Sequence, residues 1–506
     1  MSSQKYILWY GESPTPGVDD RLQKRGFEII LNPENGRLDE GLLGSTWIAV
    51  INHQGSSSND PLTPYKQLPK FIDHGIFTVV VVNDRAEQLA LQEHLTTINP
   101  DYPWDAMVRF IPNWVGVHFD IVVTFQPRPK WHFCEIVELD DAEKLTPEER
   151  LLVIRAFQKA EYVKLREIKG GYSESRVFMA YEKRRQQTSS IAHITQPRLV
   201  KIGKRKDLAD EAAAMLEVSP FVPFELRPNL EVCIEGFLKA IYVADFVDKS
   251  ESLYDAARAG RAETAISNLF NRTLQRWRDR GRQCARSTKS LASAAEGLEI
   301  IRPSSILKDY TESESVQKAN LDISHMWDAL KGIEFSHRAA TIHGDLHGDN
   351  VRVRGDDAIL IDLGSVKGKD EPGQGAPLCF DVAMLEVALV FGCNPTDKDK
   401  DVFHDTAWER EVAQYYHLDV ITNAPDALLP LEPDSWLFGC LQRIRAFGIY
   451  DQSDEHEYAI ALVIAMWRLC KFRPRTNQEK GRRVFALITG ARILQQVLDR
   501  RGYASP

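Results

Sequence analysis

The stretch His343-Gly344-Asp345-Leu346-His347-Gly348-Asp349-Asn350, followed by Ile361-Asp362-Leu363-Gly364, decides how this chain is interpreted. Asp345 and Asn350 are five positions apart, and Asp362 ends a short apolar run. A first Asp can orient a substrate hydroxyl, while an Asn and a second Asp can hold Mg²⁺ against the phosphates of ATP. The pattern therefore predicts a phosphoryl-transfer site with Asp345 as its catalytic group and Asn350 and Asp362 as its metal ligands.

This pair of motifs resembles the catalytic loop and metal-binding Asp of the protein-kinase-like superfamily. The His-Gly-Asp-Leu-His form is more similar to the aminoglycoside (and choline) phosphotransferase branch than to protein kinases, whose loop usually reads His-Arg-Asp. Only eighteen residues separate Asp362 from Asp381, where a protein kinase places a long activation segment. The resemblance implies that Asp381 is buried and hydrogen-bonds the loop backbone, and that His343 braces the loop.

The resemblance covers roughly residues 150–506 and implies a nucleotide-binding lysine upstream of the loop. Lys201 stands among apolar strand residues, so its ammonium needs a polar partner. The resemblance implies that the Lys201 ammonium contacts the α- and β-phosphates of ATP and pairs with a carboxylate of the next helix. The candidate for this carboxylate is Glu211, with Glu217 as the fallback. A lysine that snorkels from an edge strand is the structural alternative.

Two further segments are candidates for binding the nucleotide. A strand, a bend and a strand are expected over residues 168–178, and the bend could bring backbone amides and hydroxyls to the phosphates; its candidate residues are Gly170, Gly171 and Ser173. The backbone around Ala244, in the strand expected at 240–247, would pair with adenine. A plain hairpin and a plain core strand are the respective alternatives.

The first ~130 residues predict a separate α/β domain. Short apolar runs alternate with helical patterns, which indicates a parallel sheet with helices on both faces. The order and spacing resemble a response-regulator receiver or another flavodoxin-like domain. The expected strands are 6–10, 27–31, 47–51 and 76–82, and the expected helices are 18–25, 65–73 and 86–97.

This domain lacks the chemistry of a receiver. Asn52 and His53 stand where the phosphoacceptor Asp would end the third strand, and a convincing Lys after the fifth strand is missing. Neither residue recreates an aspartyl-phosphate site that holds magnesium. The sequence therefore predicts that residues 1–130 sense a signal or dock a partner, with a protein as the candidate partner, rather than accept a phosphoryl group.

The remaining chain predicts an α+β, bilobal, protein-kinase-like domain. A Pro-rich segment at 126–130 and an acidic stretch at 135–143 mark the boundary. A helix follows at 146–160, begun by a Thr146 capping box. The small lobe is then expected at 145–248 and a mainly helical large lobe at 249–506, with helices at 207–216, 265–280, 381–390 and 458–469.

Composition narrows the class of partner and the compartment. The net charge of −9 argues against a general nucleic-acid binder. The seven scattered cysteines predict free thiols in a reducing cytoplasm. A signal peptide and a membrane span are not expected from the apolar runs. The basic residues between 272 and 289 are expected to form a solvated helix face, although they could instead face an anionic substrate.

The cluster around His347 and Asp349 allows one other interpretation, a transition-metal site. The glycine-rich loop is a poor frame for a pair of histidine ligands, and no Cys is near in sequence. His347 is therefore expected to pack or to touch the substrate.

Two functions of different classes follow. The first is an ATP- and Mg²⁺-dependent phosphotransferase that acts on a hydroxyl of an unidentified, small-molecule acceptor, with the N-terminal domain as a regulatory or docking module. The second is a nucleotide-binding signalling scaffold with weak catalysis. A receiver-like domain fused to such a domain resembles bacterial signalling or conflict-system proteins, including those with a ternary-complex-associated kinase-like domain.

Overall fold

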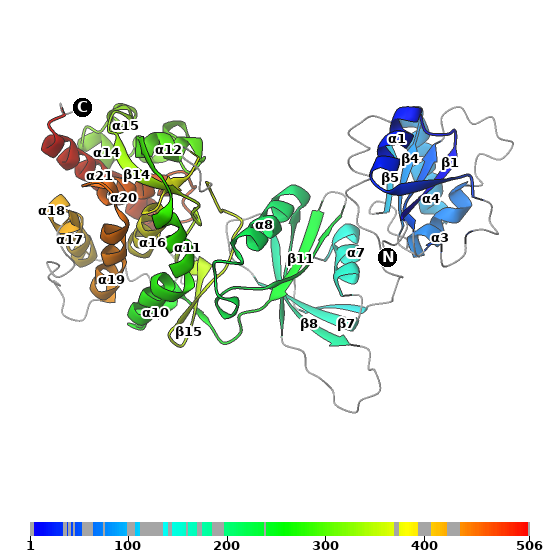
Figure 1. Ribbon diagram of the computed structural model, residues 1–506, viewed down its shortest axis with the longest axis horizontal. Coiled ribbons are helices and arrows are strands. Elements are labelled where there is room, and N and C mark those ends of the chain that lie inside the picture. The colour runs from blue at the N-terminus through cyan, green and yellow to red at the C-terminus, as the bar shows by residue number, and fades with distance from the viewer. Residues whose placement is uncertain are drawn as a thin grey trace. The chain divides into compact units, whose positions relative to one another are not determined.

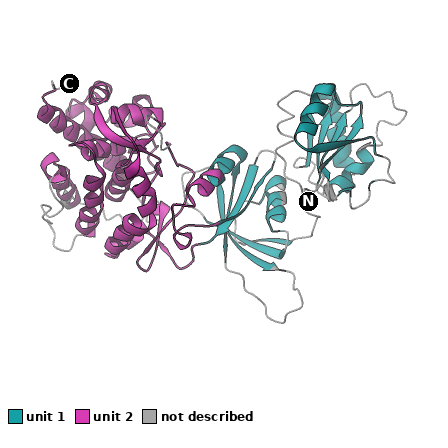
Figure 2. Ribbon diagram, viewed as in Figure 1, with its two compact units in different colours: residues 1–212, 230–246 teal, residues 213–229, 247–506 magenta. Residues whose placement is uncertain are grey.

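The chain forms two compact units, residues 1–212 with 230–246 and residues 213–229 with 247–506 (Figure 2). The computed structural model describes a subset of the residues in each. These are residues 5–33, 38, 42–43, 46–52, 64–73, 76–98, 107–111, 135–139, 144–157, 160–168, 175–184, 197–236, 239–368, 374–392, 406–422 and 436–503.

The first unit begins with a five-stranded parallel sheet in the order β2-β1-β3-β4-β5 (Figure 1). This is the strand order of flavodoxin-like doubly wound sheets, and the predicted parallel sheet is confirmed. Its strands are β1 (Lys5–Gly11), β2 (Phe27–Leu31), β3 (Thr46–Asn52), β4 (Phe77–Val81) and β5 (Val108–Ile111). Its helices are α1 (Pro16–Lys24), the 3-10 helix η2 (Pro64–Gln67), α3 (Leu68–Asp73) and α4 (Arg85–Ile98).

Both faces of this sheet are buried because its strands are apolar at consecutive positions. Successive side chains of a strand point to opposite faces, so Ile7 and Trp9 enter one core while Leu8 and Tyr10 enter another. The first core includes Val18 and Leu22 of α1, and the second includes residues of α3 and α4. Helices therefore cover both faces, as expected of a doubly wound sheet.

Amide side chains tie the carboxyl ends of the central strands together. Asn32 accepts a hydrogen bond from the Gly11 N–H at 2.8 Å and donates to the Gly11 carbonyl at 3.3 Å. Asn52, which ends β3, donates to the Glu12 carbonyl at 3.2 Å. His53 and the residues that follow β5 lie outside the described chain. The docking or sensing role of this domain stays a prediction.

The second sheet of the first unit has six strands in the order β10-β11-β9-β8-β7-β6. All neighbours are antiparallel except β6 and β7. The strands are β6 (Glu135–Leu139), β7 (Ala160–Glu167), β8 (Arg176–Arg184), β9 (Arg198–Lys204), β10 (Leu230–Glu235) and β11 (Lys239–Asp245). β6 lies in the acidic stretch that was expected to be a boundary. Charged residues are common on edge strands, so the acidic composition of this segment did not indicate a strand.

Helix α7 (Pro147–Ala156) begins with the predicted capping box. The Glu149 N–H donates to the Thr146 hydroxyl at 3.3 Å, and Glu149 accepts from the Thr146 N–H at 2.8 Å. The helix ends four residues earlier than expected because β7 starts at Ala160. Its apolar face, with Leu152 and Val153, packs in the core of the second sheet.

The described part of the second unit is mainly helical and carries two small sheets, β12-β15-β16 and β13-β14-β17. Their strands are β12 (Glu251–Ser252), β13 (Arg286–Lys289), β14 (Phe335–Ala340), β15 (Val351–Arg354), β16 (Asp357–Leu360) and β17 (Ala376–Pro377). The longer helices are α12 (Leu291–Gly297), α15 (Ile323–Lys331), α16 (Phe380–Phe391), α17 (Thr406–Tyr415), α19 (Trp436–Asp451), α20 (Glu457–Leu469) and α21 (Asn477–Arg501).

The single helix expected at 265–280 is wrong. The chain forms α10 (Ala262–Asn268), a π-helical turn η4 (Leu269–Thr273) and α11 (Gln275–Gln283). Asn268 and Thr273 donate from this segment to the carbonyls of Asp356 and Ala358, at 2.8 and 2.6 Å. The π turn thus places polar side chains against the β15–β16 hairpin, which leads to Asp362.

The basic run between 272 and 289 is mostly the solvated face that was expected, since five of its members are exposed (Arg272, Arg276, Arg280, Arg286 and Lys289), but two arginines of α11 depart from it. Arg278 is buried and donates twice to Asp451, at 3.0 and 2.5 Å. Arg282 donates to the other oxygen of Asp451 at 3.0 Å. The partner lies on α19, about 170 residues later, so the local sequence gave no sign of it.

The five cysteines in the described chain, at positions 233, 284, 379, 440 and 470, are free thiols as predicted. Cys134 and Cys393 lie outside it. Among the helices that are described, none has both the length and the apolar character needed to cross a membrane.

Candidate functional site

The loop that follows β14, residues 341–350 and here called the Asp345 loop, is held by the side chain of Asp381. The first residues of α16 include Asp381, whose carboxylate accepts the N–H groups of His343 at 2.7 Å and Gly344 at 2.9 Å. Burial raises the pKa of Asp381, while His343 and the two backbone N–H groups oppose that rise. The predicted hydrogen bonding between Asp381 and the loop backbone is confirmed.

Gly344 is required by the backbone of the Asp345 loop. Its φ is +78°, and a Cβ built there would lie 2.4 Å from the Ser365 carbonyl oxygen. We expect Gly344→Ala to lower the free energy of unfolding by roughly 2 kcal/mol or more, because strain at positive φ and a clash with backbone add together. Urea unfolding measures this loss. Gly355→Ala is the matched control, since that glycine has φ +63° with open space around it; an equal loss in both variants would contradict the clash.

Asp345 lies in an ion pair. The Arg468 guanidinium, near the end of α20, donates to Asp345 Oδ1 at 2.7 Å, and His347 Nε2 lies 3.7 Å from Oδ2. Burial by itself would raise the pKa of Asp345, but Arg468 and His347 outweigh it and hold the pKa below the ordinary value. Asp345 is therefore a carboxylate at neutral pH, able to accept a hydrogen bond from a hydroxyl.

Asn350 links the Asp345 loop to the chain that carries Asp362. It is buried, and its side-chain amide nitrogen donates to the Asp345 carbonyl at 2.9 Å. Its own carbonyl accepts the Ile361 N–H at 2.8 Å. The two predicted metal ligands are thus brought together through one backbone hydrogen bond.

Asp362 follows β16 and has an unusual backbone. Its φ is +55°, in the left-handed region that Asp and Asn tolerate better than other residues with a Cβ. The side chain is exposed, and its Oδ1 accepts the Gly364 N–H at 3.4 Å. A strained conformation at one end of a functional motif is a common feature of binding sites. Paired backbone hydrogen bonds between Ile342 and Lys367, 2.9 and 3.0 Å, hold this turn beside the Asp345 loop.

The residues at this position fit magnesium. Mg²⁺ in nucleotide sites takes one or two protein oxygens and completes its octahedron with phosphates and water. The Asn350 amide nitrogen donates to the Asp345 carbonyl, so the Asn350 amide oxygen is the atom that would bind the metal. Asp362 supplies an exposed carboxylate.

Lys201 and Glu211 form a buried ion pair in the first unit. Lys201 Nζ donates to both carboxylate oxygens of Glu211, at 3.0 and 2.8 Å, and both residues are buried. Lys201 on β9 stands directly opposite Tyr242 on β11, so the two side chains share one face of the sheet. The Tyr242 hydroxyl donates to Glu211 at 2.8 Å. Helix α8 (Arg205–Val218) brings Glu211 to this face, whereas Glu217 is exposed.

The other predicted nucleotide-binding residues are placed only in part. Gly170, Gly171 and Ser173 lie outside the described residues. Ala244 is buried near the end of β11, opposite Leu199. Its role near adenine stays a prediction.

Two residues of these clusters were not expected from the sequence. Tyr242 could have been found from the strand register that places it opposite Lys201. Arg468 had a weaker signal, because it is the single charged residue between positions 458 and 469 of an otherwise apolar helix.

Comparisons with known proteins gave matches at the level of structure alone. No protein-family model matches the chain, and no curated protein matches its sequence. An aminoglycoside phosphotransferase from Streptomyces rimosus is 15% identical over 58% of this chain and 97% of its own, with a TM-score of 0.29. Its complex with ADP and streptomycin gives 14% over the same shares and a TM-score of 0.30. A protein assigned as a fructosamine-3-kinase from Haemophilus somnus is 11% identical over 69% and 96%, with a TM-score of 0.32.

Proposed function

We propose that the chain is an ATP- and Mg²⁺-dependent phosphotransferase that acts on a hydroxyl of a small-molecule acceptor. Asp345 orients the acceptor hydroxyl. Asn350 and Asp362 hold Mg²⁺, and Lys201, fixed by Glu211, positions the α- and β-phosphates. The glycine- and serine-containing bend at Gly170, Gly171 and Ser173 and the backbone at Ala244 complete the nucleotide contacts.

The observation that carries this proposal is the arrangement in the second unit. Asp345 and Asn350 lie in one loop that Asp381 fixes from α16, and a backbone hydrogen bond from Ile361 to Asn350 places the Asp362 turn beside it. A carboxylate for a hydroxyl and two oxygen ligands for Mg²⁺ are the parts that phosphoryl transfer needs. The Lys201–Glu211 pair in the second sheet supports it independently, because charged side chains are seldom buried without a specific role.

A nucleotide-binding test separates this proposal from a structural role. We expect ATP with Mg²⁺ to raise the melting temperature of the full chain, and Asp362→Asn to lose most of the magnesium-dependent part of that shift. Asn is chosen because it tolerates the left-handed backbone at this position, so a lost shift reports the missing charge. Asp356→Asn, in the exposed turn before β16, is the matched control. Equal magnesium-dependent shifts in all three proteins would refute the assignment of Asp362.

The lysine is tested in the same assay. Lys201→Met keeps the apolar stem and removes the charge, so we expect weaker ATP stabilisation both with and without Mg²⁺. An unchanged shift would assign the Lys201–Glu211 pair to the fold of the sheet alone.

A second candidate function is a nucleotide-binding scaffold with little catalysis. The ion pair favours it, since the carboxylate of Asp345 is engaged by Arg468 at 2.7 Å and a hydroxyl has to compete for it. In that case ATP would act as a ligand, and output would pass through a protein partner of the N-terminal domain. A reducing cytoplasm is the compartment that the free thiols favour.

A further inference from the structure

Basic side chains from three separate segments of the second unit gather around the Asp345 loop. One precedes the 3-10 helix η5 (Pro303–Ser305), one follows the Asp362 turn, and two lie at and after the end of α20. We call these residues the basic cluster; its members are Arg302, Lys367, Arg468 and Lys471.

Two members of the basic cluster touch the Asp345 loop directly. Arg468 donates to Asp345 at 2.7 Å. Lys367 pairs with Ile342 through the backbone, and its side chain crosses Gly344 so closely that a Cβ there would lie 2.8 Å from Lys367 Cγ. One cation of the cluster thus pairs with Asp345, and the aliphatic stem of a second passes close to Gly344 of the same loop.

The other two members are joined to each other through Glu299. Lys471 Nζ donates to the Glu299 carbonyl at 3.3 Å, and the Arg302 guanidinium lies 3.5 Å from the Glu299 carboxylate. Burial lowers the pKa of Lys471, the charges of Arg468, Lys367 and Arg302 lower it further, and Glu299 opposes them, so Lys471 lies close enough to the three other cations to be repelled by them. In the described chain, the carboxylates recorded against the cluster are those of Asp345 and Glu299.

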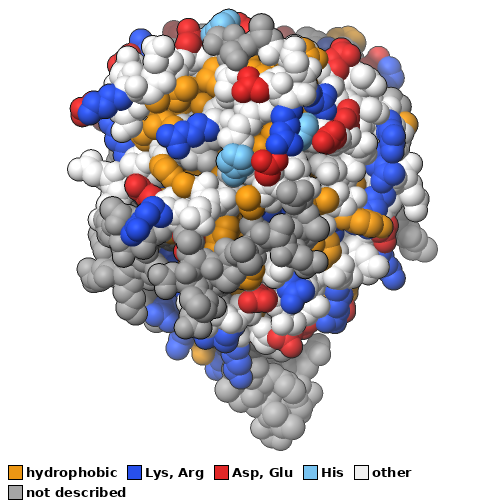
Figure 3. Space-filling model, turned by 90° about the vertical axis from the view of Figure 1, so that its left-hand side faces the viewer, with side chains coloured by type: hydrophobic (Ala, Val, Ile, Leu, Met, Phe, Trp, Pro, Cys, Tyr) orange, Lys and Arg blue, Asp and Glu red, His pale blue; other side chains and the backbone are white. Residues whose placement is uncertain are grey.

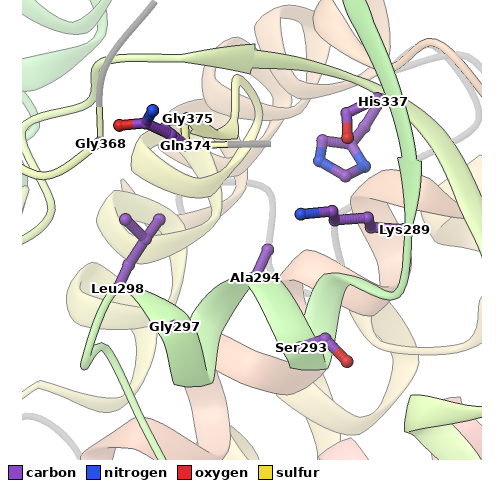
Figure 4. Close-up of a pocket in the computed structure, with 10 residues that line it drawn as sticks. Lys289, Ser293, Ala294, Gly297, Leu298, His337, Gly368, Gln374 and Gly375 are labelled. Atoms are coloured by element: carbon purple, nitrogen blue, oxygen red, sulfur yellow. The ribbon is translucent and has the colours of Figure 1, made fainter. Parts of the chain in front are cut away.

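A cavity of about 600 Å³ has wall residues that are chain neighbours of the basic cluster and of its partner Glu299. Its wall includes Gly368, which follows Lys367, and Leu298, which precedes Glu299. Figure 4 shows the Lys289 ammonium and the His337 ring reaching into the cavity from one side, with Leu298 and Gln374 on the other. The cavity is large enough for a small polar molecule, and burial lowers the pKa of His337, so Lys289 supplies the charge on that side.

The positive charge is local. On the face drawn in Figure 3, basic and acidic side chains of the described residues are interspersed rather than gathered into one field. The whole chain carries a net charge of −9. Four cations that face two carboxylates, Asp345 and Glu299, therefore point to a local ligand of opposite charge rather than to a broad anionic partner.

We propose that the acceptor is an anionic hydroxyl compound, whose carboxylate or phosphate group is bound by Lys367 and Lys471 while its body lies in the cavity. This proposal rests on the proposed phosphotransferase function and names its substrate class. The acceptor oxygen forms a bond to the γ-phosphorus of ATP, the bond from that phosphorus to the β–γ bridging oxygen breaks, ADP leaves, and the hydroxyl proton passes to Asp345. A cationic acceptor would meet repulsion from the same side chains.

Inorganic phosphate is the probe that tests the site without requiring turnover. Phosphate binding to the full chain, saturated with Mg–ADP, is measured by isothermal titration calorimetry. We expect a Lys367→Met and Lys471→Met double variant to bind phosphate at least about tenfold more weakly, since two charge-assisted contacts are lost. Lys318→Met is the matched control, because Lys318 is exposed and pairs with Glu314, which has no recorded contact with the cluster in the described chain.

Equal phosphate affinity in the wild type and the double variant would overturn the proposal, as would the absence of saturable phosphate binding in the wild type. The same samples report Mg–ADP binding first. If the wild type does not bind Mg–ADP, the proposed function is contradicted. If it binds Mg–ADP but the double variant binds phosphate as tightly as the wild type, the anionic acceptor alone is contradicted.

Competition identifies the source of the negative charge. Glycerol 3-phosphate and glycerate are expected to displace phosphate, and glycerol is not. Stronger displacement by glycerol 3-phosphate would indicate that the acceptor is a phosphate ester, and stronger displacement by glycerate would indicate that it is a carboxylate. Displacement by glycerol at the same concentration as its charged analogues would overturn the role of charge.

Discussion

The Asp345→Asn variant is expected to transfer phosphoryl groups at least about 100-fold more slowly than the wild type while it binds Mg–ATP with similar affinity. The amide has nearly the same shape but cannot take the proton of the hydroxyl. Because Asn350 and Asp362 are unchanged, the metal and the nucleotide keep their ligands. The measurement is ADP release in the presence of acceptor, paired with ATP binding.

The pH dependence of the wild type sharpens this prediction. Arg468 and His347 outweigh the effect of burial and hold the pKa of Asp345 below its ordinary value. A lowered pKa in the folded state means that the stability contributed by this carboxylate is present above the unfolded pKa and is lost as the pH falls through the folded pKa. Asp345 therefore stays ionised throughout the neutral range, and an activity loss between pH 6 and 8 cannot come from its protonation.

Asp356→Asn makes the same chemical change in the exposed turn between β15 and β16 and serves as the control for Asp345→Asn. If Asp345→Asn retained most of the wild-type rate, Asp345 would not be the hydroxyl-orienting group. If it left the biological output unchanged while abolishing transfer, the scaffold function would be favoured.

The Glu386→Ala variant is expected to lose about 3–5 kcal/mol of the free energy of unfolding. Glu386 on α16 and Arg445 on α19 are both fully buried, at 0% and 1% exposure, and the guanidinium donates to the carboxylate at 2.9 and 3.1 Å. The Tyr458 hydroxyl on α20 donates to the same carboxylate at 2.7 Å. Alanine would leave the buried charge of Arg445 without its counter-ion, which costs more than the lost contact itself.

Urea unfolding of Glu386→Ala and of a Glu386→Leu and Arg445→Met double variant distinguishes charge from packing. The double variant is expected to regain most of the stability, because replacing both partners of a buried pair with apolar residues is often nearly neutral. A loss below about 1 kcal/mol in Glu386→Ala would show that the pair is not desolvated.

This buried pair also bears on the candidate site. Through the Tyr458 hydroxyl, the same Glu386 carboxylate also joins α16, which carries Asp381, to α20, which carries Arg468. Asp381 holds the backbone of the Asp345 loop and Arg468 holds its carboxylate. We therefore expect replacement of Glu386 to lower the free energy of unfolding and, under the proposed function, to slow phosphoryl transfer as well.

Patterns that are local in sequence predicted much of the fold. The short apolar runs placed four strands of the first sheet, β1 to β4, within one residue at each end, whereas β5 was not expected; Thr146 with Glu149 marked the start of α7. The spacing of Asp345, Asn350 and Asp362 predicted residues whose segments the structure joins, by a bond from the Asn350 side chain to the Asp345 carbonyl and one from the Ile361 N–H to the Asn350 carbonyl. In each case the pattern lies within one continuous stretch of the sequence.

Features that depend on distant partners could not be predicted in the same way. Arg468 reaches Asp345 across 123 positions of the chain, and Arg278 reaches Asp451 across 173. The π turn at 269–273 exists because its neighbours bond the β15–β16 hairpin, 85 residues away. A basic run on a helix has the same composition whether it faces solvent or a buried carboxylate.

The two hydrogen bonds from Asp381 to the Asp345 loop have a consequence for how such a chain can diverge. The loop is fixed by Asp381 of α16 and by the pairing of Ile342 with Lys367, and both attachments are made by residues outside the segment between Gly368 and β17. Substitutions within that segment are therefore expected to leave the Asp345 loop in place. Under the proposed function, relatives of this chain could then differ in the cavity wall near Gly368 and Gln374, and in the molecule that they recognise, while they keep the same loop.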